Sequence, residues 1–489
     1  MSRAVMSLLS LKVHRADNTT LDLSDRVIQY TQRESLEGFP SFSLALPLAL
    51  DGAPVIETFR IGDLLEAGFT HTQDGLSYAY RTTMVGVIQK IGQQQALTER
   101  GLTRVASVSG VGLAGFLAAD SVNYWVATNL ARVFKTAGEA RLESLAMKRL
   151  DQALAAFMEQ VAFDVLKIRR PQGDVRRLLA YCFRSLEGVG QYYLRWANFE
   201  GALWGFLDAY AEKPLHELYS LTLPLAEFER LEGVKPDPAR LAAFGPDRAV
   251  AAVIHRPAPF PYATPDGKPT LGEWPRLPLH DLTPEHLEAG TDHSADWDVA
   301  SVRNAFFLTP ATFALDTTLQ KAYIPVVVNV PKWERYGYRP LSWQTGLWGQ
   351  DARGEGITEF FRALNWRVAA QHNRLEEYSG ATLELRLAPW LQPGHRAKYR
   401  HYVGDDTAIF QGYITSVTHT WSPGPQGKRS TTVQLDRCTG EAIYTRDIGF
   451  FTFGLSEYNP LGDKDLPEAQ VRARDGGPAK RPTGAGEQP

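Results

Sequence analysis

Histidine and carboxylate side chains gather at two places in the middle of the chain. The segment His280–Glu288 reads HDLTPEHLE, and Thr291–Asp298 reads TDHSADWD. Paired carboxylates can serve as general acid and base, and mixed His and Asp clusters can hold a metal ion. However, the spacing matches no established ligand pattern, and both segments lie in a Pro-rich stretch that is typical of a solvated loop. We therefore predict no catalytic residue and no metal site here.

Three further histidines, His395, His401 and His419, fall on or beside predicted strands, where packing or surface roles are favoured over chemistry. The sequence also contains no G-x-S-x-G motif, no phosphate-binding P-loop and no dinucleotide-binding fingerprint. The run Gly110–Gly115, GVGLAG, has the wrong glycine spacing for a phosphate loop and predicts a strand-to-helix turn. These observations predict no cofactor and no enzymatic activity.

The eleven tryptophans raise the possibility of sugar-stacking platforms. Trp125, Trp196, Trp204 and Trp366 lie among apolar neighbours at helix-like positions, which favours core packing over sugar binding. A glycan-binding module therefore remains the alternative interpretation.

Length and composition describe a folded protein with several domains. At 489 residues the chain is too long for one core, and two to four domains are expected. A formal net charge of −3 gives no electrostatic basis for gripping nucleic acid, which needs clustered Lys and Arg. The two cysteines, Cys182 and Cys438, form no disulfide framework. We predict that both are reduced, and a bridge between them is the alternative.

The N-terminal residues MSRAVMSLLSLKVHRADN lack a small-residue cleavage site, which argues against a signal peptide. No stretch approaches the roughly 18–20 apolar residues of a membrane span. We therefore expect a chain that is made in a cytoplasm and has no membrane-spanning segment.

The hydrophobic pattern changes along the chain from strand-like to helical and back. Short apolar runs broken by Gly, Asp and Pro fill the first part, and Leu150, Leu154 and Phe157 then recur at helical spacing. The pattern predicts an α+β protein that is mainly β, with two similar antiparallel β regions, of which the first reads as a small barrel or sandwich, joined by a helical and irregular middle region. The predicted parts are a first barrel (1–115), a helical and mixed domain (116–235), a Pro-rich irregular excursion (236–300), a strand and connecting helix (301–380), a second barrel (381–460) and a flexible tail (461–489).

The two predicted barrels contain the same sequence of parts. Met84–Gly110 and Phe410–Gly440 each hold a strand with the pattern x-G-x-I, a polar loop and a closing strand that ends on Gly. Because glycines at matching places imply matching turns or bulges, we predict repeated turn or bulge positions. The matched pairs are Gly62 with Gly394, Gly86 with Gly412, and Gly110 with Gly440. The predicted wall strands carry Val87, Ile88, Val105, Tyr413, Ile414 and Val433.

The order of motifs along the whole chain has a counterpart in a known family. The features are FRIGDLL with MVGVIQKI in the first barrel, ALWGFLDAYAEKPLHELY in the middle, VIHRPAPFP, and the helix EFFRALNW that leads into FQGYITSVTHTW. Together they resemble the central hub proteins of contractile phage baseplates, whose fold also forms the hub part of type VI secretion spike proteins and of extracellular contractile injection systems. The likeness spans roughly Leu21 to Gly440, and its specificity lies in the order and spacing of the motifs.

The resemblance implies a structural protein without catalytic residues or cofactors. It implies two tail-tube-like barrels per chain and a homotrimer that forms a pseudo-hexameric ring, with the wall strands named above at the ring interface. Such a ring adapts a six-fold tail tube to a three-fold spike. The implied partners are further copies of the chain, the tail tube protein ring and a separate spike protein. Tape measure and baseplate wedge proteins are further candidates, and DNA is only passing cargo.

The implied location is the tail tip or baseplate of a virion or extracellular injection particle assembled in a bacterial cytoplasm. Two alternatives from other classes remain open. One is a tail-associated cell-wall hydrolase with the helical middle region as catalytic domain, and the other is a glycan-binding tail adhesin.

Overall fold

The computed structural model describes most of the chain in two compact units. The described residues are 8–73, 77–98, 101–119, 121–122, 149–163, 177–186, 191–192, 201–282, 294–296, 298–310, 324–348, 355–403, 406–424, 427–440 and 454–458. Unit 1 comprises Met1–Pro257, Leu277–Asp296 and Gly380–Cys438, and unit 2 comprises Ala258–Arg276, Trp297–Ser379 and Thr439–Pro489.

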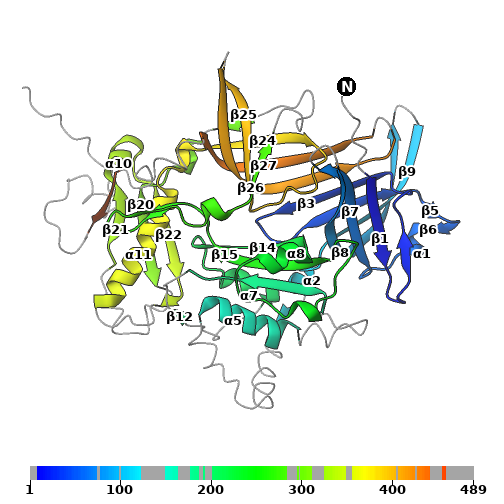
Figure 1. The fold of residues 1–489 in the computed structure, drawn as a ribbon, viewed down its shortest axis with the longest axis horizontal. Coiled ribbons are helices and arrows are strands. Elements are labelled where there is room, and N and C mark those ends of the chain that lie inside the picture. Colours follow the sequence, from blue (N-terminus) through cyan, green and yellow to red (C-terminus); the bar gives the residue numbers. More distant parts are fainter. Residues whose placement is uncertain are drawn as a thin grey trace, which may run out of the picture. The chain divides into compact units, whose positions relative to one another are not determined.

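A 13-stranded sheet dominates unit 1 (Figure 1). Its main path runs in the order β19-β24-β27-β26-β3-β4-β9-β8-β7-β1-β2, while β25 pairs with both β26 and β18. The strands are β1 (Leu8–His14), β2 (Thr20–Asp22), β3 (Gln29–Ser35), β4 (Ser41–Leu46), β7 (Leu64–Gln73), β8 (Ser77–Thr98), β9 (Gly101–Gly112), β18 (Leu279–Leu282), β19 (Ser294–Asp296), β24 (Ser379–Arg386), β25 (Arg396–Val403), β26 (Asp406–Trp421) and β27 (Arg429–Gly440).

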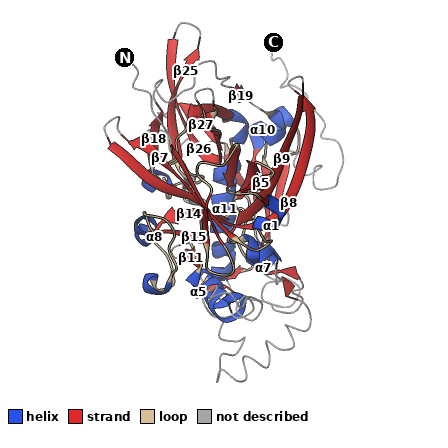
Figure 2. Ribbon diagram, turned by 90° about the vertical axis from the view of Figure 1, so that its right-hand side faces the viewer, coloured by secondary structure: helices blue, strands red, loops and turns tan. Residues whose placement is uncertain are grey.

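Alternating burial explains why these segments form strands. In β3 and in β24, every second residue is buried, which matches the two-residue period of a strand with one face on a core. β8 and β9 pair along most of their length and form a long hairpin (Figure 2). Two apolar cores lie under the sheet, and the first, which is built mainly from residues 9–108, also contains Leu387 and Trp421.

The middle part of unit 1 contains a small sheet of order β11-β15-β14. Its strands β11 (Leu179–Phe183), β14 (His216–Pro224) and β15 (Ala249–Pro257) are almost fully buried, as expected for strands covered on both faces. The remaining elements of unit 1 are β5 (Ala49–Leu50), β6 (Ala53–Pro54), α1 (Val55–Thr58), α2 (Gly115–Ala119), β10 (Ser121–Val122), α5 (Leu150–Phe157), the π-helical turn η1 (Met158–Ala162), β12 (Gln191–Tyr192), β13 (Gly201–Ala202), α7 (Leu203–Ala209), α8 (Leu225–Arg230) and η3 (Pro238–Arg240).

Unit 2 is built on a four-stranded sheet of order β22-β20-β21-β28. The long helix α11 (Glu355–His372) packs on it through Trp366 and Ala369, which contact Phe306 and Val327 of the sheet in one apolar cluster. The other elements are β16 (Tyr262–Ala263), β17 (Pro269–Thr270), η4 (Trp274–Arg276), η5 (Val299–Ser301), β20 (Ala305–Pro310), β21 (Val326–Asn329), α10 (Val330–Tyr336), β22 (Pro340–Thr345), β23 (Leu347–Trp348), η6 (Leu375–Glu377) and β28 (Leu455–Tyr458).

The prediction of a mainly β fold is confirmed, but two separate closed barrels are not found among the residues that the structure describes. The strands of both predicted barrels belong to one open sheet, because β3 of the first pairs with β26 of the second. Regular structure also forms within 236–300, where we expected an irregular excursion: Ala249–Pro257 is a continuous apolar run and becomes β15. The predicted tail, 461–489, lies outside the described residues.

The helical and cysteine predictions can be placed as well. Leu150, Leu154 and Phe157 are buried on α5, as their spacing predicts. Cys182 and Cys438 are both free and buried, so the alternative bridge between them does not form.

Candidate assembly interface

The turn before the first x-G-x-I strand has a defined hydrogen-bond pattern. Gly62 has a φ of +99°, a left-handed conformation that strongly favours glycine. The Gly62 N–H donates to the Ile88 carbonyl at 2.8 Å, and the Ile88 N–H donates to the Asp63 carbonyl at 2.9 Å. The turn is thereby clamped onto the middle of β8.

The turn before the second x-G-x-I strand repeats this pattern. Gly394 has a φ of +86°, and its N–H donates to the Ile414 carbonyl at 2.8 Å. The Ile414 N–H in turn donates to the His395 carbonyl at 2.9 Å. The sequence match of Gly62 with Gly394 and of Ile88 with Ile414 therefore corresponds to two turns with the same backbone bonding.

The second predicted glycine pair, Gly86 and Gly412, lies at crowded points of the two strands. A Cβ on Gly86 would lie 2.6 Å from the Val111 carbonyl oxygen, and a Cβ on Gly412 would lie 2.5 Å from the Cys438 sulfur. Both positions exclude a side chain because the neighbouring strand approaches closely.

The third pair, Gly110 and Gly440, differs between the two copies. Gly110 lies opposite Ile88 in the ladder, and a Cβ there would meet the Val87 carbonyl oxygen at 1.9 Å. Gly440 ends β27, and a Cβ there would meet nothing within 4 Å. The two glycines therefore do not occupy equivalent environments.

The predicted wall residues lie mostly inside the chain. Val87, Ile88, Tyr413, Ile414 and Val433 are at most 5% exposed, so their side chains pack unit 1 itself. The sixth, Val105 on β9, is half-buried and lies opposite Gln94. A place for these strands at a ring interface remains a prediction.

The strand order repeats together with the turns. In the first copy the order is β4-β9-β8-β7, and in the second it is β24-β27-β26-β25. Each copy therefore has a three-strand meander whose last strand pairs with an earlier strand. We call β3, β4 and β7–β9 repeat 1, and β24–β27 repeat 2.

A seam of paired strands joins the repeats. Ser416–Trp421 of β26 pairs antiparallel with Tyr30–Ser35 of β3, and the Leu36 N–H extends this pairing to the Thr415 carbonyl. The chain thus already contains one repeat-to-repeat sheet contact.

Buried polar groups line this seam. Gln32 accepts hydrogen bonds from Tyr30 at 2.8 Å and Thr83 at 2.7 Å. Glu34 is 2% exposed, and burial raises its pKa to about 8. His419 lies 2.8 Å from the Thr431 hydroxyl, and burial lowers its pKa to about 3. At neutral pH the seam therefore holds a protonated Glu34 and a neutral His419.

Among the strands that the structure describes, the corresponding edge of repeat 1 has no such partner. β7 pairs with β8 only as far as Val87, and beyond Lys90 β8 pairs with β9 alone among the described strands. Lys90 and Gln93 are exposed there. The seam that is filled in repeat 2 is therefore open in repeat 1.

A buried ionic network holds repeat 2 against the middle sheet. Arg256 of β15 donates to Glu217 at 3.1 Å, to the Tyr413 hydroxyl at 2.7 Å and to the Gly394 carbonyl at 3.0 Å. Tyr413 also donates to Glu217 at 2.6 Å. Because burial raises the pKa of Tyr413 well above its usual value, its hydroxyl keeps its proton and remains a donor. The Gly394 turn of repeat 2 is thus fixed by charge-assisted bonds.

Repeat 1 is held to the same middle region by different side chains. Arg81 of β8 forms a two-pronged ion pair with Glu227 of α8, at 2.5 and 2.8 Å. The Thr82 N–H and hydroxyl donate to Asp247 at 2.7 and 2.6 Å. These contacts leave little freedom for the repeats to rotate against each other.

The histidines predicted as packing residues are now placed. His395 lies 3.0 Å from His280, nitrogen to nitrogen, and the two rings stack. Burial lowers the pKa of His280 to about 4 and that of His395 well below its usual value, with the neighbouring Arg81 adding to both shifts. The side chain of His401 and most of the two acidic segments lie outside the described residues. Among the described residues no group of three or more His, Cys, Asp or Glu could hold a metal ion.

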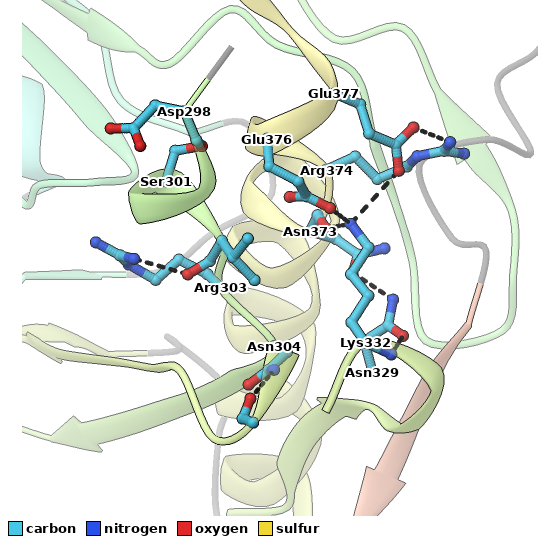
Figure 3. Close-up of polar contacts among 12 residues, drawn as sticks. Asp298, Ser301, Arg303, Asn304, Asn329, Lys332, Asn373, Arg374, Glu376 and Glu377 are labelled. Carbon is cyan, nitrogen blue, oxygen red and sulfur yellow. Dashed lines mark hydrogen bonds and ion pairs between the residues drawn. The ribbon is translucent and has the colours of Figure 1, made fainter. Parts of the chain in front are cut away.

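Unit 2 contains a polar cluster at the end of α11 (Figure 3). Lys332 forms an ion pair with Glu376, donates to the Asn373 carbonyl, and lies 3.6 Å from Glu377. Asn329 accepts from the Lys332 N–H as the cap of α10 and donates to the Asn373 side chain at 2.7 Å. Burial lowers the pKa of Lys332, but its paired carboxylate stabilises the charge. The cluster closes two helix ends, which explains its polar groups without catalysis.

The tryptophans that the sequence assigned to packing can be checked in part. Trp366 is 8% exposed and packs in unit 2, while Trp204 is half-buried with its ring 5.4 Å from Phe39. Trp125 and Trp196 lie outside the described residues.

Sequence reasoning missed the Arg256 network and the Lys332 cluster. Arg256 stands in the motif VIHRPAPFP, which marked the position, but nothing local indicates that Glu217 and Tyr413 meet it.

Comparison with known proteins gives structural likeness alone. No family model matches the sequence, and no curated protein matches it. A tail protein from Neisseria meningitidis MC58 is similar in structure, with a TM-score of 0.44 and 15% identity over 90% of this chain and 99% of that one. The 43 kDa tail protein of prophage MuSo2 from Shewanella oneidensis gives 0.44 and 11% over 88% and 97%. A protein of the phage P2 baseplate gives 0.32 and 9% over 88% and 99%.

These three neighbours are two tail proteins and a protein of a phage baseplate. None of the described helices is long and apolar enough to cross a membrane.

Proposed function

We propose that this protein is the structural hub of a phage tail or related injection particle. Three copies form a ring of six repeats that joins a six-fold tail tube to a three-fold spike. The observation that carries the proposal is that one chain contains two β repeats with the same turn bonding and the same strand order, joined in one sheet. A chain that already pairs two repeats side by side is suited to continue the same pairing around a ring.

The anchoring network supports this function mechanically. A ring closes only if each repeat meets the next at a constant angle. Arg256 with Glu217 fixes repeat 2, and Arg81 with Glu227 fixes repeat 1, on the same middle region. In this proposal the two charged pairs serve to specify the geometry of the repeats rather than to add stability.

In this proposal the partners are other copies of the chain, the tube ring on one face and a separate spike protein on the other. Tape measure and baseplate wedge proteins are further candidate partners, and DNA or the tape measure protein passes through the channel. The protein is then a component of the assembled particle rather than an enzyme.

The test is the mass and shape of the purified full-length chain. Native mass spectrometry over a range of concentrations, followed by electron microscopy of the largest species, should give trimers that appear as rings with six lobes. A chain that stays monomeric up to its solubility limit, or an even-numbered assembly, would overturn the proposal. Turnover of cell-wall material by the monomer would instead support the hydrolase alternative.

A further inference from the structure

The filled seam in repeat 2 provides a template for the open edge in repeat 1. Ile88 and Ile414 are matched by their turn bonds, so residues beyond them can be matched by counting along the strands. Ile91 packs against the first core as Val417 packs in the second, three residues further on in both cases. The matching therefore continues past the bulge that follows Ile88.

Burial differs sharply between matched positions. Ser416 and His419, which pair with Ser35 and Gln32 of β3, are 4% and 1% exposed, while their counterparts Lys90 and Gln93 are exposed. The turn shows the same contrast: Ile61 before Gly62 is 73% exposed, and Pro393 before Gly394 is buried. Repeat 1 thus exposes an apolar residue and a strand edge that are covered in repeat 2.

A strand equivalent to β3 exists at the other end of the sheet. β3 pairs antiparallel with β4, where Arg33 lies opposite Ser41. β19 pairs antiparallel with β24, where Asp296 lies opposite Gly380. β19 is the last strand on the main path among the described strands, so its outer edge has no partner there. The sheet therefore ends in a strand, β19, whose position corresponds to that of β3. It also contains one strand edge, in β8, that has no strand corresponding to β3 paired with it among the described strands.

We propose that the outer edge of β19 in one copy pairs antiparallel with Gly92–Gln94, within the segment Lys90–Gln95 of β8, in the next copy. This inference rests on the proposed self-assembly and specifies its contact. In the template His419 lies opposite Gln32. The proposal takes Gly380 of β24 as the counterpart of Ser41 of β4, which puts Ala295 at the position of Gln32, so Gln93 of one copy lies opposite Ala295 of the next. The occupant is a second copy of this chain because the contact continues an existing one, β26 with β3, by the same strand geometry.

The pairing has a physical advantage for the chain. An exposed strand edge presents unpaired N–H and C=O groups and invites unspecific association. Pairing β8 with β19 satisfies these groups, and each chain contributes one β19 edge and one β8 edge. Such a head-to-tail contact closes into a ring when its rotation matches the symmetry.

The test is site-directed cross-linking of the full-length chain with Gln93→Cys and Ala295→Cys in the same molecule. Opposed residues of antiparallel strands have Cα atoms about 4.5–5.5 Å apart, within the range that a disulfide spans. Mild oxidation should give covalent dimers and trimers on a non-reducing gel. The native Cys182 and Cys438 are buried, and the parent chain, which contains only these two cysteines, gives the background level of cross-linking.

Three matched controls define the outcome. Each single Cys variant should stay uncross-linked, and the pair Lys90→Cys with Ala295→Cys, three residues out of register, should react at least ten-fold more slowly. A trimer by mass that does not cross-link at Gln93 and Ala295 overturns this inference and leaves the proposed function standing. A monomer overturns both. Hydrogen exchange gives a second measurement, in which Lys90–Gln95 should gain protection as the protein concentration rises.

Discussion

Glu34 allows a sharp test of how the seam between the repeats is held together. The carboxyl group lies on β3 opposite Val417, and burial raises its pKa from 4.5 to about 8, against an opposing effect of Arg81. The folded chain therefore keeps a proton that the unfolded chain loses above its own pKa of 4.5. It follows that the seam loses stability as the pH rises from 4.5 towards 8.

The magnitude follows from the two pKa values. At about pH 7.5 the unfolded carboxyl is three pH units above its pKa, while folded Glu34 is still mostly protonated, so holding the proton costs about 4 kcal/mol. The variant Glu34→Gln is uncharged and similar in size, and should remove this cost. At about pH 5 the same calculation gives a cost below about 1 kcal/mol.

Hydrogen exchange by mass spectrometry measures the effect locally, on peptides from β3 and β26. After correction for intrinsic exchange, Glu34→Gln should raise protection by nearly three orders of magnitude at about pH 7.5 and by about four-fold at pH 5. Glu37→Gln, an exposed position close by, is the matched control and should change neither value. A gain for Glu34→Gln that does not vary with pH would refute the reasoning.

Three other changes test the remaining parts of the unit. His419→Gln removes a histidine whose pKa falls from 6.5 to about 3 on folding. The parent protein should therefore lose about 2 kcal/mol more of its free energy of unfolding than the variant when the pH is lowered to about 5. Urea unfolding of the variant and the parent measures this difference. Arg256→Met leaves Glu217 buried without its cation and should cost about 3–5 kcal/mol in the same assay, while changing both residues to apolar ones should cost less. Gly110→Ala should lower the free energy of unfolding by about 1–3 kcal/mol because its Cβ meets a carbonyl, whereas Gly440→Ala should change it by less than about 0.5 kcal/mol. Equal effects at the two glycines would contradict the packing described here.

The local features of the repeat could be predicted from sequence because glycine reports on the backbone around it. Gly62 and Gly394 were matched from spacing alone, and both have the positive φ that only a turn of this kind requires. Gly110 and Gly440 have different surroundings, and sequence does not distinguish a glycine that ends a strand from one that makes room for a neighbour.

Contacts between distant segments could not be predicted in this way. The pairing of β3 with β26 joins strands from opposite ends of the chain. The hydrophobic periodicity of a strand indicates which of its faces is buried, but not which strand pairs with its edge. For the same reason the sequence predicted two barrels where one continuous sheet forms. β18 and β19 could not be recognised within the Pro-rich stretch, because strands of three or four residues have too few side chains to show an alternation of apolar and polar residues.

The differences between the two repeats give a reason why a chain with two repeats would suit the connection of a six-fold tube to a three-fold spike. The backbone of the two repeats is equivalent at the turns, but the side chains at the seams are not: His419 and Glu34 occupy the filled seam, while Gln93 lies at the open edge. In a ring of three chains, main-chain pairing would then repeat six times, whereas side-chain chemistry would repeat three times. A tube that docks on backbone shape can therefore meet six similar lobes, and a spike that recognises side chains can meet three. Two repeats within one chain separate these two requirements, which identical subunits in a simple hexamer cannot do because every seam would carry the same residues.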